Sequence, residues 1–347
     1  MATYTILTPA GASFTTAGGG YEYEMEALQG LGATIVECPA TEEGFIAAAP
    51  SADAVYAKGM KFTAAMINAL TKCRHIALGT VGVDYVDVAA ATAKGIPVTN
   101  CPDTFIEEVA DHAMMLLLAT HRRCIEQDRM VREGRWSEGR PQLLQIPRLM
   151  GQTLGFIAFG RVARATARRA AAFGLRMKAF DPFVEELTMS GLGVEPASLD
   201  EVLSTSDFVS MHLPDTPESR GFMKEQHFRR MKPNALFINT GRGPTVNEAA
   251  LVKALQEKWI AGAGLDVFEV EPTKPGNPLH AMSNVILSPH NASASARFDP
   301  ARKRRVGQEL ALTLSGKWPL SCVNPTVLAG SGLRRWQPYA MERGPNS

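Results

Sequence analysis

Apolar residues recur along the chain in short continuous runs, separated by longer stretches with a helical period. The runs that predict strands are residues 5–8, 34–37, 54–57, 75–78, 97–99, 153–158, 177–180, 208–212, 235–239, 262–267 and 285–287. Strands that alternate with helix-length segments are typical of βαβ units, which build parallel sheets. The pattern therefore predicts an α/β fold.

So many strands do not fit comfortably in one sheet, which indicates two parallel-sheet domains. Five strands precede the Asn100-Cys101-Pro102 segment, and about six follow it. Long helices predicted over about 103–133 and 294–314 bracket the second group. A strand-like fragment at 322–327 follows the second of these helices.

The simplest arrangement of these elements is a discontinuous first domain and a continuous second one. The first comprises residues 1–100 plus 300–330, and the second comprises residues 101–299. The remaining tail, residues 331–347, begins with Ser-Gly after Gly330 and contains three arginines and two prolines. This composition predicts a loosely ordered segment.

The overall composition favours a soluble globular protein without a nucleic-acid or membrane partner. Of the 347 residues, 45% are hydrophobic and 20% are charged, and the formal net charge is +1. A balanced charge supplies no general attraction to nucleic acid or to an anionic membrane. The longest apolar run, 113–119, is too short to span a bilayer. With no signal-peptide pattern at the start of the sequence, we expect a cytoplasmic protein.

The five cysteines are scattered and lack CxxC spacing, so neither a disulfide framework nor a zinc cluster is expected. No metal site is predicted. The basic run 302–305 lies in a helical stretch and is interpreted as a solvated face.

Residues 151–181 have the pattern of a dinucleotide-binding βαβ unit: a strand, a turn, a helix and a second strand. The glycine fingerprint is degenerate, since Ala158-Phe159-Gly160-Arg161-Val162-Ala163 stands where G-x-G-x-x-G is expected. Gly160 is kept where the backbone approaches a pyrophosphate, and Ala163 is an accepted variant for helix–strand packing. Ala158 replaces the tight-turn glycine, so the turn is expected to keep φ negative there.

Asp181 ends the second strand of this unit at the spacing expected of a ribose ligand. Its carboxylate would accept hydrogen bonds from the adenosine ribose and repel a 2′-phosphate. Pro182 and Phe183 offer no arginine to such a phosphate. NAD is therefore predicted as the cofactor in preference to NADP. The alternative is a structural βαβ unit with Asp181 as a turn residue.

From residue 50 to 327 the chain resembles the D-isomer-specific 2-hydroxyacid dehydrogenase family. The stretches that carry the resemblance are 81–100, 151–182, 207–223, 231–255, 261–272 and 288–293. The resemblance implies a flavodoxin-like substrate-binding domain and an NAD-binding Rossmann domain, with the active-site cleft between them. It also implies NAD-dependent interconversion of 2-oxoacids and D-2-hydroxyacids. The FGRVAR and DP stretches lean towards the branch that contains the C-terminal-binding proteins.

The resemblance implies a catalytic set of Arg242, Glu271 and His290. A guanidinium orients a substrate carboxylate and polarises a ketone. An imidazole exchanges a proton near neutral pH, and a neighbouring carboxylate favours its protonated form. Glu269 stands two residues before Glu271 and is the alternative holder of the carboxylate role. Arg242 has the alternative of a surface turn residue.

The family's cofactor-lining and substrate-binding positions also have counterparts in this sequence. The implied cofactor-binding residues are Phe159, Gly160, Arg161, Val162, Asp181, His212, Leu213, Pro214, Thr216, Thr240, Gly241, Arg242, Asp266, His290 and Ala292. The implied substrate-binding residues are Lys58, Val81, Gly82, Arg242 and His290. For Lys58 a solvated side chain is an equal alternative. The other histidines, His75, His112, His121, His212, His227 and His280, are expected to be structural or exposed, with His212 a partial exception at the cofactor.

Two features leave the exact function open. Asn291 and Ala292 replace the usual Ile-Gly after the histidine, which leaves open a substrate other than the family's commonest ones. An NAD(H)-sensing corepressor is the alternative from another class, and phosphite and formate dehydrogenases rank lower. The 103–133 helix with the arm to Trp136 resembles the family's dimerisation element, which predicts a homodimer. Core burial is the alternative for that helix.

Overall fold

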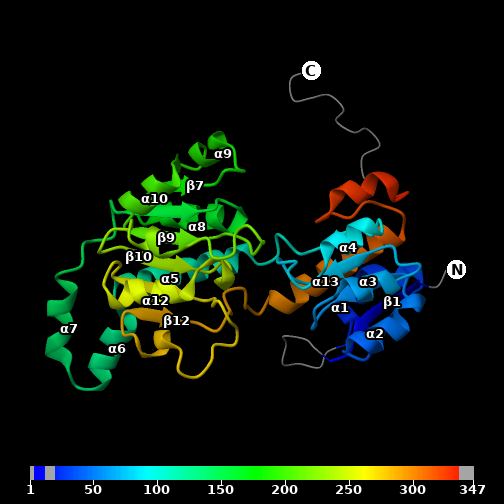
Figure 1. The fold of residues 1–347 in the computed structure, drawn as a ribbon, viewed down its shortest axis with the longest axis horizontal. Helices are drawn as coiled ribbons and strands as arrows, with labels where there is room; N and C mark the ends of the chain where they lie inside the picture. The colour runs from blue at the N-terminus through cyan, green and yellow to red at the C-terminus, as the bar shows by residue number, and fades with distance from the viewer. Residues whose placement is uncertain (1–3, 12–19, 336–347) are drawn as a thin grey trace. The chain divides into compact units, whose positions relative to one another are not determined.

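The computed structural model describes residues 4–11 and 20–335. The chain divides into two compact units, Met1–Thr104 with Ala296–Ser347 and Phe105–Ser295. Each unit is a parallel β-sheet with helices packed against it (Figure 1). This confirms the predicted fold class of two parallel-sheet α/β domains. Among the described residues, no helix is both long enough and apolar enough to cross a membrane.

The first unit contains a five-stranded parallel sheet. Its strands, in the order in which they pair, are β2 (Ala33–Cys38), β1 (Tyr4–Pro9), β3 (Ala54–Ala57), β4 (Ile76–Leu78) and β5 (Val98–Thr99). Its helices are α1 (Glu22–Leu28), α2 (Glu42–Ala48), α3 (Ala64–Ala69), α4 (Val88–Ala93) and α13 (Phe298–Leu314). The side chains of Thr41, Thr63 and Asp87 each accept an amide hydrogen bond at the start of a helix, which explains where α2, α3 and α4 begin.

The second unit contains a seven-stranded parallel sheet. Its order is β12 (Val285–Leu287), β11 (Gly262–Leu265), β10 (Leu236–Asn239), β9 (Phe208–Met211), β6 (Thr153–Ile157), β7 (Arg176–Phe180) and β8 (Glu195–Pro196). Its helices are α5 (Ile106–His121), α6 (Cys124–Arg132), α7 (Trp136–Leu143), α8 (Arg161–Ala172), α9 (Glu186–Ser190), α10 (Leu199–Thr205), α11 (Glu225–Phe228) and α12 (Glu248–Gln256). The direction of strand succession reverses between β6 and β9, where open α/β sheets bind ligands.

The structure differs from the sequence expectation in three elements, two that were predicted wrongly and one that was not predicted. The single helix expected over 103–133 is wrong, because Arg123 has a left-handed φ of 50° and the chain turns there between α5 and α6. The fragment 322–327 is not a strand, since Pro325–Gly330 forms a 3-10 helix. Strand β8 was not predicted, because two residues with a glutamate give no apolar run.

The start of the predicted tail is held in place. Residues 331–335 lie against the turn after α13, where Arg334 donates its amide to Gly316 over 2.9 Å. The Trp318 indole donates to the Leu333 carbonyl over 3.0 Å. The rest of the predicted tail, residues 336–347, lies outside the described residues.

His75 ties three elements of the first unit together. Its ring is buried at the start of β4, with Nε2 2.8 Å from the Thr99 hydroxyl and Nδ1 2.7 Å from the Thr313 hydroxyl of α13. Burial lowers the pKa of His75 to about 3, so the ring is neutral when folded. Folding the chain therefore requires an uncharged imidazole at this position.

We expect His75 to make the stability of the protein depend on pH. Its pKa falls from 6.5 to about 3 on folding, so the unfolded chain takes up the proton first as the solution is acidified. Its contribution to stability is complete above pH 6.5 and is lost progressively as the pH falls towards 3, by up to about 1.4 kcal/mol per pH unit. Urea titrations of the parent and of His75→Gln at several pH values measure this. A loss of stability on acidification that is equally steep in both proteins would contradict it.

Candidate active site

The three predicted catalytic residues follow three neighbouring strands of the second unit. Arg242 comes after β10, Glu271 after β11 and His290 after β12. These strands pair side by side in the order β12-β11-β10. Because the strands are parallel, their carboxyl ends meet at one edge of the sheet, and the three loops emerge together there.

Glu271 and His290 form a hydrogen-bonded pair. Nδ1 of His290 lies 2.6 Å from Oε2 of Glu271, and Oε1 of the same carboxylate accepts the Phe268 amide over 2.9 Å. Burial alone would raise the pKa of Glu271, but the hydrogen bonds from His290 and Phe268 and the charges of His290 and Arg242 outweigh it and lower that pKa. An ionised Glu271 accepts a hydrogen bond from the Nδ1–H of His290, so Nε2 of the imidazole remains for a ligand.

Glu269 has a different role from Glu271. Its carboxylate accepts the amide of Glu248 at the start of α12 over 2.9 Å. The Glu269 amide in turn donates to the Glu248 carboxylate over 3.1 Å. The contact with the histidine belongs to Glu271, as the motif indicates.

The loop that carries Arg242 packs directly on the loop that carries Glu271. A Cβ atom on Gly243 would lie 1.8 Å from the carbonyl oxygen of Phe268, so only glycine permits this approach. The Arg242 carbonyl accepts the Thr245 hydroxyl over 2.6 Å, and its Nη1 donates to the Gly241 carbonyl over 2.9 Å. The guanidinium is thereby held on the side of the sheet where its charge acts on Glu271.

His290 lies in a strained turn that one buried carboxylate holds. Its φ is +47°, a left-handed conformation that costs a residue with a Cβ about 1–2 kcal/mol. Asp266, 1% exposed, accepts the Asn291 amide over 3.0 Å, the Ala292 amide over 2.9 Å and the Ser288 hydroxyl over 2.6 Å. The predicted cofactor residues Asp266 and Ala292 are thus hydrogen-bonded to each other, and the same carboxylate shapes the turn that carries His290.

The fingerprint turn after β6 differs from the expectation at Ala158. Its φ is +68°, so the prediction of a negative φ was wrong. The Ala158 amide donates to the Phe180 carbonyl over 2.9 Å, and the Phe159 amide donates to Asp181 over 2.8 Å. These two bonds to the neighbouring strand β7 and its end hold the glycine-type turn although an alanine occupies it.

The other features of this region fit a dinucleotide. A Cβ on Gly160 would meet no atom within 4 Å, so the space beside its backbone is open. Gly160 precedes α8, whose first turn contains Arg161 and Val162 and has no side-chain cap, so the amides there are available to an anion. Asp181 also accepts the Phe183 amide over 2.8 Å.

The segment after β9 and the end of β10 supply the remaining predicted cofactor residues. Nε2 of His212 is 2.8 Å from the Ser210 hydroxyl, and burial lowers the pKa of His212 to about 4, so it is neutral. Leu213, Pro214 and Thr216 follow in a turn held by Ser219, whose hydroxyl donates to the Pro214 carbonyl over 2.6 Å. The buried Thr240 hydroxyl, next to Gly241, has no hydrogen-bond partner among the described residues.

The predicted substrate residues Lys58, Val81 and Gly82 lie in the first unit. Lys58 follows β3, and the other two follow β4. A cavity of about 70 Å³ is lined by Ala57, Lys58, Gly59, Met60, Phe62, Leu78, Gly79, Thr80, Tyr85 and Arg302. Lys58 is half-buried and donates to the Tyr21 hydroxyl over 3.0 Å, so it is not simply solvated. Burial lowers its pKa below the ordinary value.

Sequence reasoning missed two residues that support the turn carrying His290. His112 of α5 lies 2.8 Å from the Ser288 hydroxyl, and that hydroxyl donates to Asp266. Ser288 directly precedes the Pro-His motif, and this position next to His290 was a signal that could have identified it. His112 comes from a helix more than 170 residues away in sequence, and no spacing rule connects the two.

Comparison with known proteins gives the family. Residues 114–292 match the domain described as "D-isomer specific 2-hydroxyacid dehydrogenase, NAD binding domain". The chain belongs to this family. It is therefore an oxidoreductase, a nicotinamide-dependent 2-hydroxyacid dehydrogenase.

Relatives of this dehydrogenase include several reductases. The glyoxylate reductase of Korarchaeum cryptofilum is 44% identical over 266 residues, which are 76% of this chain and 80% of that protein. The D-3-phosphoglycerate dehydrogenase of Mycobacterium bovis is 36% identical over 280 residues, 80% of this chain and 52% of that protein. A solved NADPH-dependent glyoxylate/hydroxypyruvate reductase of Sinorhizobium meliloti, in complex with NADP and malonate, is 33% identical with a TM-score of 0.78, and the match covers 97% of this chain and 100% of that one.

These relatives bear on two finer expectations. Their names are those of reductases and dehydrogenases, so the predicted lean towards the C-terminal-binding-protein branch is not supported. The Sinorhizobium meliloti structure contains NADP, so kinship alone does not decide between the two cofactors.

Proposed function

We propose that this dehydrogenase reduces a small 2-oxoacid to the D-2-hydroxyacid, with His290 as the proton donor. The observation that carries the proposal is the His290–Glu271 pair beside the Arg242 loop. The glyoxylate reductases among its relatives support a 2-oxoacid as substrate.

Each of the three residues has a distinct task in this proposal. The Arg242 guanidinium binds the substrate carboxylate and polarises the keto group. Bound NADH supplies the hydride. Nε2 of His290 donates the proton that the resulting alkoxide oxygen needs, while Glu271 stabilises the protonated ring and orients it through Nδ1. In the oxidative direction a neutral His290 accepts the hydroxyl proton.

The first unit is proposed to bind the rest of the substrate. Its cavity of about 70 Å³ is small, which favours a substrate with a small side chain. The Val81-Gly82 backbone, proposed as a substrate contact, is anchored by Asn100 on the Val81 carbonyl (2.6 Å) and by Thr80 on the Gly82 carbonyl (2.7 Å).

We expect His290→Gln to lower kcat for glyoxylate reduction by about 10²–10⁴-fold, because it removes the proton donor. NADH affinity, measured by fluorescence titration, should change little. Glu271→Gln should lower kcat by a smaller factor, since it keeps the hydrogen bond but loses the charge. The exposed His280→Gln is the matched control and should behave as the parent.

Two results would overturn this assignment. One is a His290→Gln variant that keeps a tenth or more of the parental kcat. The other is a parent that binds NADH but turns over no member of a panel of glyoxylate, pyruvate and hydroxypyruvate, which would favour the NAD(H)-sensing alternative.

We also propose that NAD(H) is preferred over NADP(H). The Asp181 carboxylate follows β7 and is fixed by the amides of Phe159 and Phe183, so it cannot easily turn away from a 2′-phosphate. The negative charges of the carboxylate and of a neighbouring 2′-phosphate would repel each other.

Asp181→Ala should therefore reduce the preference of the enzyme for NADH over NADPH. We expect the ratio of kcat/KM for NADH to that for NADPH to fall about tenfold, because a repulsive charge and a ribose ligand are lost together. Asp181→Asn separates the two effects, since the amide keeps the hydrogen-bonding capacity without the charge. An unchanged ratio in both variants would remove Asp181 from cofactor selection.

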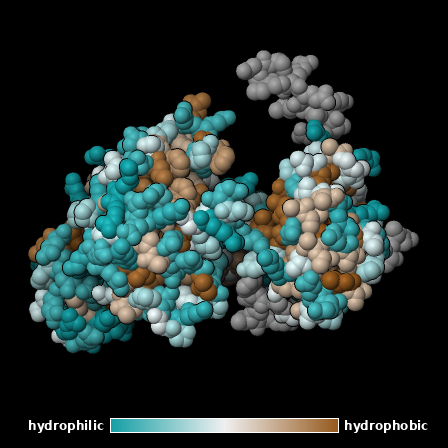
Figure 2. Space-filling model, in the orientation of Figure 1, coloured by the Kyte–Doolittle hydropathy of each residue, from teal (hydrophilic) through white to brown (hydrophobic). Residues whose placement is uncertain are grey.

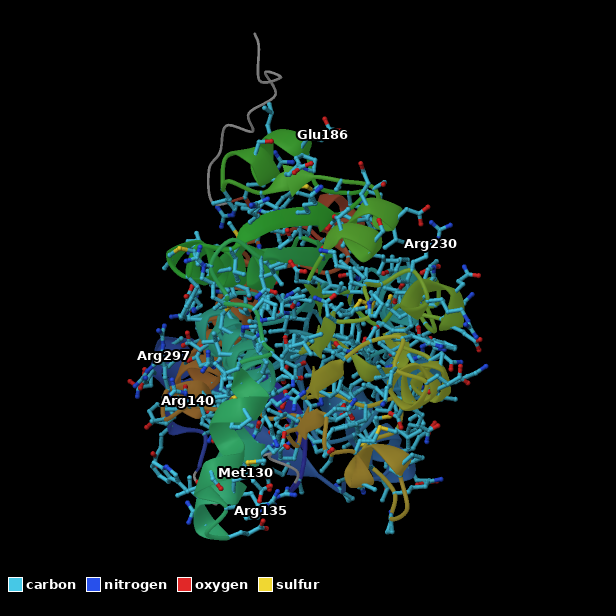
Figure 3. The ribbon with its side chains drawn as sticks, turned by 90° about the vertical axis from the view of Figure 1, so that its left-hand side faces the viewer. Met130, Arg135, Arg140, Glu186, Arg230 and Arg297 are labelled. Carbon is cyan, nitrogen blue, oxygen red and sulfur yellow. The ribbon has the colours of Figure 1, made fainter. Side chains whose placement is uncertain are left out.

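We further propose a homodimer formed through the second unit. A groove there is lined by Asp111, Met114, Met115, Leu118, Ala119, Arg122, Cys124, Arg169 and Phe173. The arm, residues 124–143, comprises α6 and α7 and lies at the periphery of this unit; Figure 3 labels Met130, Arg135 and Arg140 on it. Ile125, Val131 and Trp136 of the arm are 55%, 56% and 79% exposed. Figure 2 shows apolar groups among hydrophilic ones at this end of the unit.

Sedimentation equilibrium should give a mass of two chains for the parent. Trp136→Glu should weaken the association about tenfold or more, because it places a charge among apolar side chains at the contact. Phe183→Glu alters an even more exposed aromatic residue outside the arm and serves as the control. A parent that sediments as one chain at micromolar concentration would contradict the proposal.

A further inference from the structure

A chain of hydrogen bonds leads from helix α5 to the catalytic turn. Nε2 of His112 lies 2.8 Å from Oγ of Ser288, and this oxygen lies 2.6 Å from Oδ1 of Asp266. The same Oδ1 accepts the Asn291 amide, and Oδ2 accepts the Ala292 amide. Both amides belong to the two residues that directly follow His290.

The protons along this chain are determined by the groups at its end. An ionised Asp266 carries no proton, so it can only accept hydrogen bonds. The single hydroxyl proton of Ser288 must therefore point to Asp266. The Ser288 oxygen can then only accept from His112, so Nε2 of His112 carries a hydrogen. The bonds thus all run in one direction, from the α5 helix towards the carboxylate.

The carboxylate needs these donors because of where it lies. Asp266 is 1% exposed, so water does not solvate its charge. Nε2 of His112 is also 3.4 Å from Oδ1, close enough to add a second polar contact. Without His112 and Ser288, the carboxylate would lose two of the groups that stabilise its charge. Its hydrogen bonds to the Asn291 and Ala292 amides would then hold the turn less firmly.

We propose that Ser288 and His112 are positioning residues for His290, acting through Asp266. They hold the carboxylate directed at the 291 and 292 amides. Those amides hold His290 in its left-handed conformation, in which Nδ1 meets Glu271. The inference rests on the proposed function of His290 as proton donor and adds two residues that touch neither substrate nor cofactor.

The pH dependence of the reaction distinguishes positioning from general stabilisation. Within the second unit, Glu271 faces the His290 ring, Arg242 acts on Glu271, and Asp266 lies behind the turn with His112 beyond it. A carboxylate next to an imidazole favours its protonated form. If the turn loosens and His290 separates from Glu271, the pH at which kcat/KM for the reduction falls to half its maximum should decrease. Loss of folded protein alone would lower the amplitude but leave that pH unchanged.

The experiment compares Ser288→Ala and His112→Phe with the conservative variants Ser288→Thr and His112→Gln. The first two should lower kcat for glyoxylate about tenfold or more, because a small displacement of a reacting group is costly. They should also shift the alkaline limb of kcat/KM to lower pH, while NADH affinity changes less than about threefold. The conservative variants keep the donor and should restore both readouts substantially.

His121→Phe is the matched control on the same helix. Its ring packs on Phe208 at 5.3 Å, away from the catalytic turn. It should change the thermal midpoint without moving the alkaline limb. Ser288→Ala and His112→Phe with parental kcat and an unmoved limb would overturn the inference, as would a loss of kcat that His121→Phe reproduces. A His290→Gln variant with parental activity would instead overturn the proposed function, so the two failures are distinguishable.

Discussion

Two backbone amides and one hydroxyl from residues 288–292 converge on the carboxylate of Asp266. This contact opposes a real conformational cost, because His290 would not by itself adopt a positive φ. The pairing of His290 with Glu271 depends on that turn. A buried charge at the end of β11 thus specifies the backbone conformation of a residue after β12.

The parallel sheet brings together the loops that make these contacts. Neighbouring parallel strands deliver their loops to one edge, so residues separated by tens of positions in sequence become adjacent. Gly243 adds a steric requirement, since the chain after β10 approaches the Phe268 carbonyl too closely for any Cβ. On the other side of β9, the ends of β6 and β7 hold each other through Phe159 and Asp181. The His290–Glu271 pair and the fingerprint turn therefore lie at different strands of the same edge.

The alternation of apolar runs and helical stretches was sufficient to predict two parallel α/β sheets. The motifs were sufficient to name Arg242, Glu271 and His290, whose roles stay predictions. The pattern did not show the break at Arg123, because both flanking segments have helical composition and the turn depends on one dihedral angle. The prediction of a negative φ at Ala158 was wrong, because hydrogen bonds to the adjacent strand and to Asp181 outweigh the preference of alanine for negative φ.

The contacts of His112 lay beyond any local rule. Its neighbours in sequence are those of an ordinary amphipathic helix, and only the packing of α5 against the sheet brings its ring to Ser288. Spacing reveals pairs within one element or one motif. It does not reveal which face of a distant helix supports a loop.

The left-handed histidine has a practical consequence for anyone who would transplant this chemistry. A Pro-His dipeptide copied into another scaffold would bring the imidazole but not the buried anion that bends the chain beneath it. Exchange of the 288–292 loop alone would leave the same gap. The portable unit is the loop together with the end of β11, so recombination between relatives should keep both on the same side of a crossover.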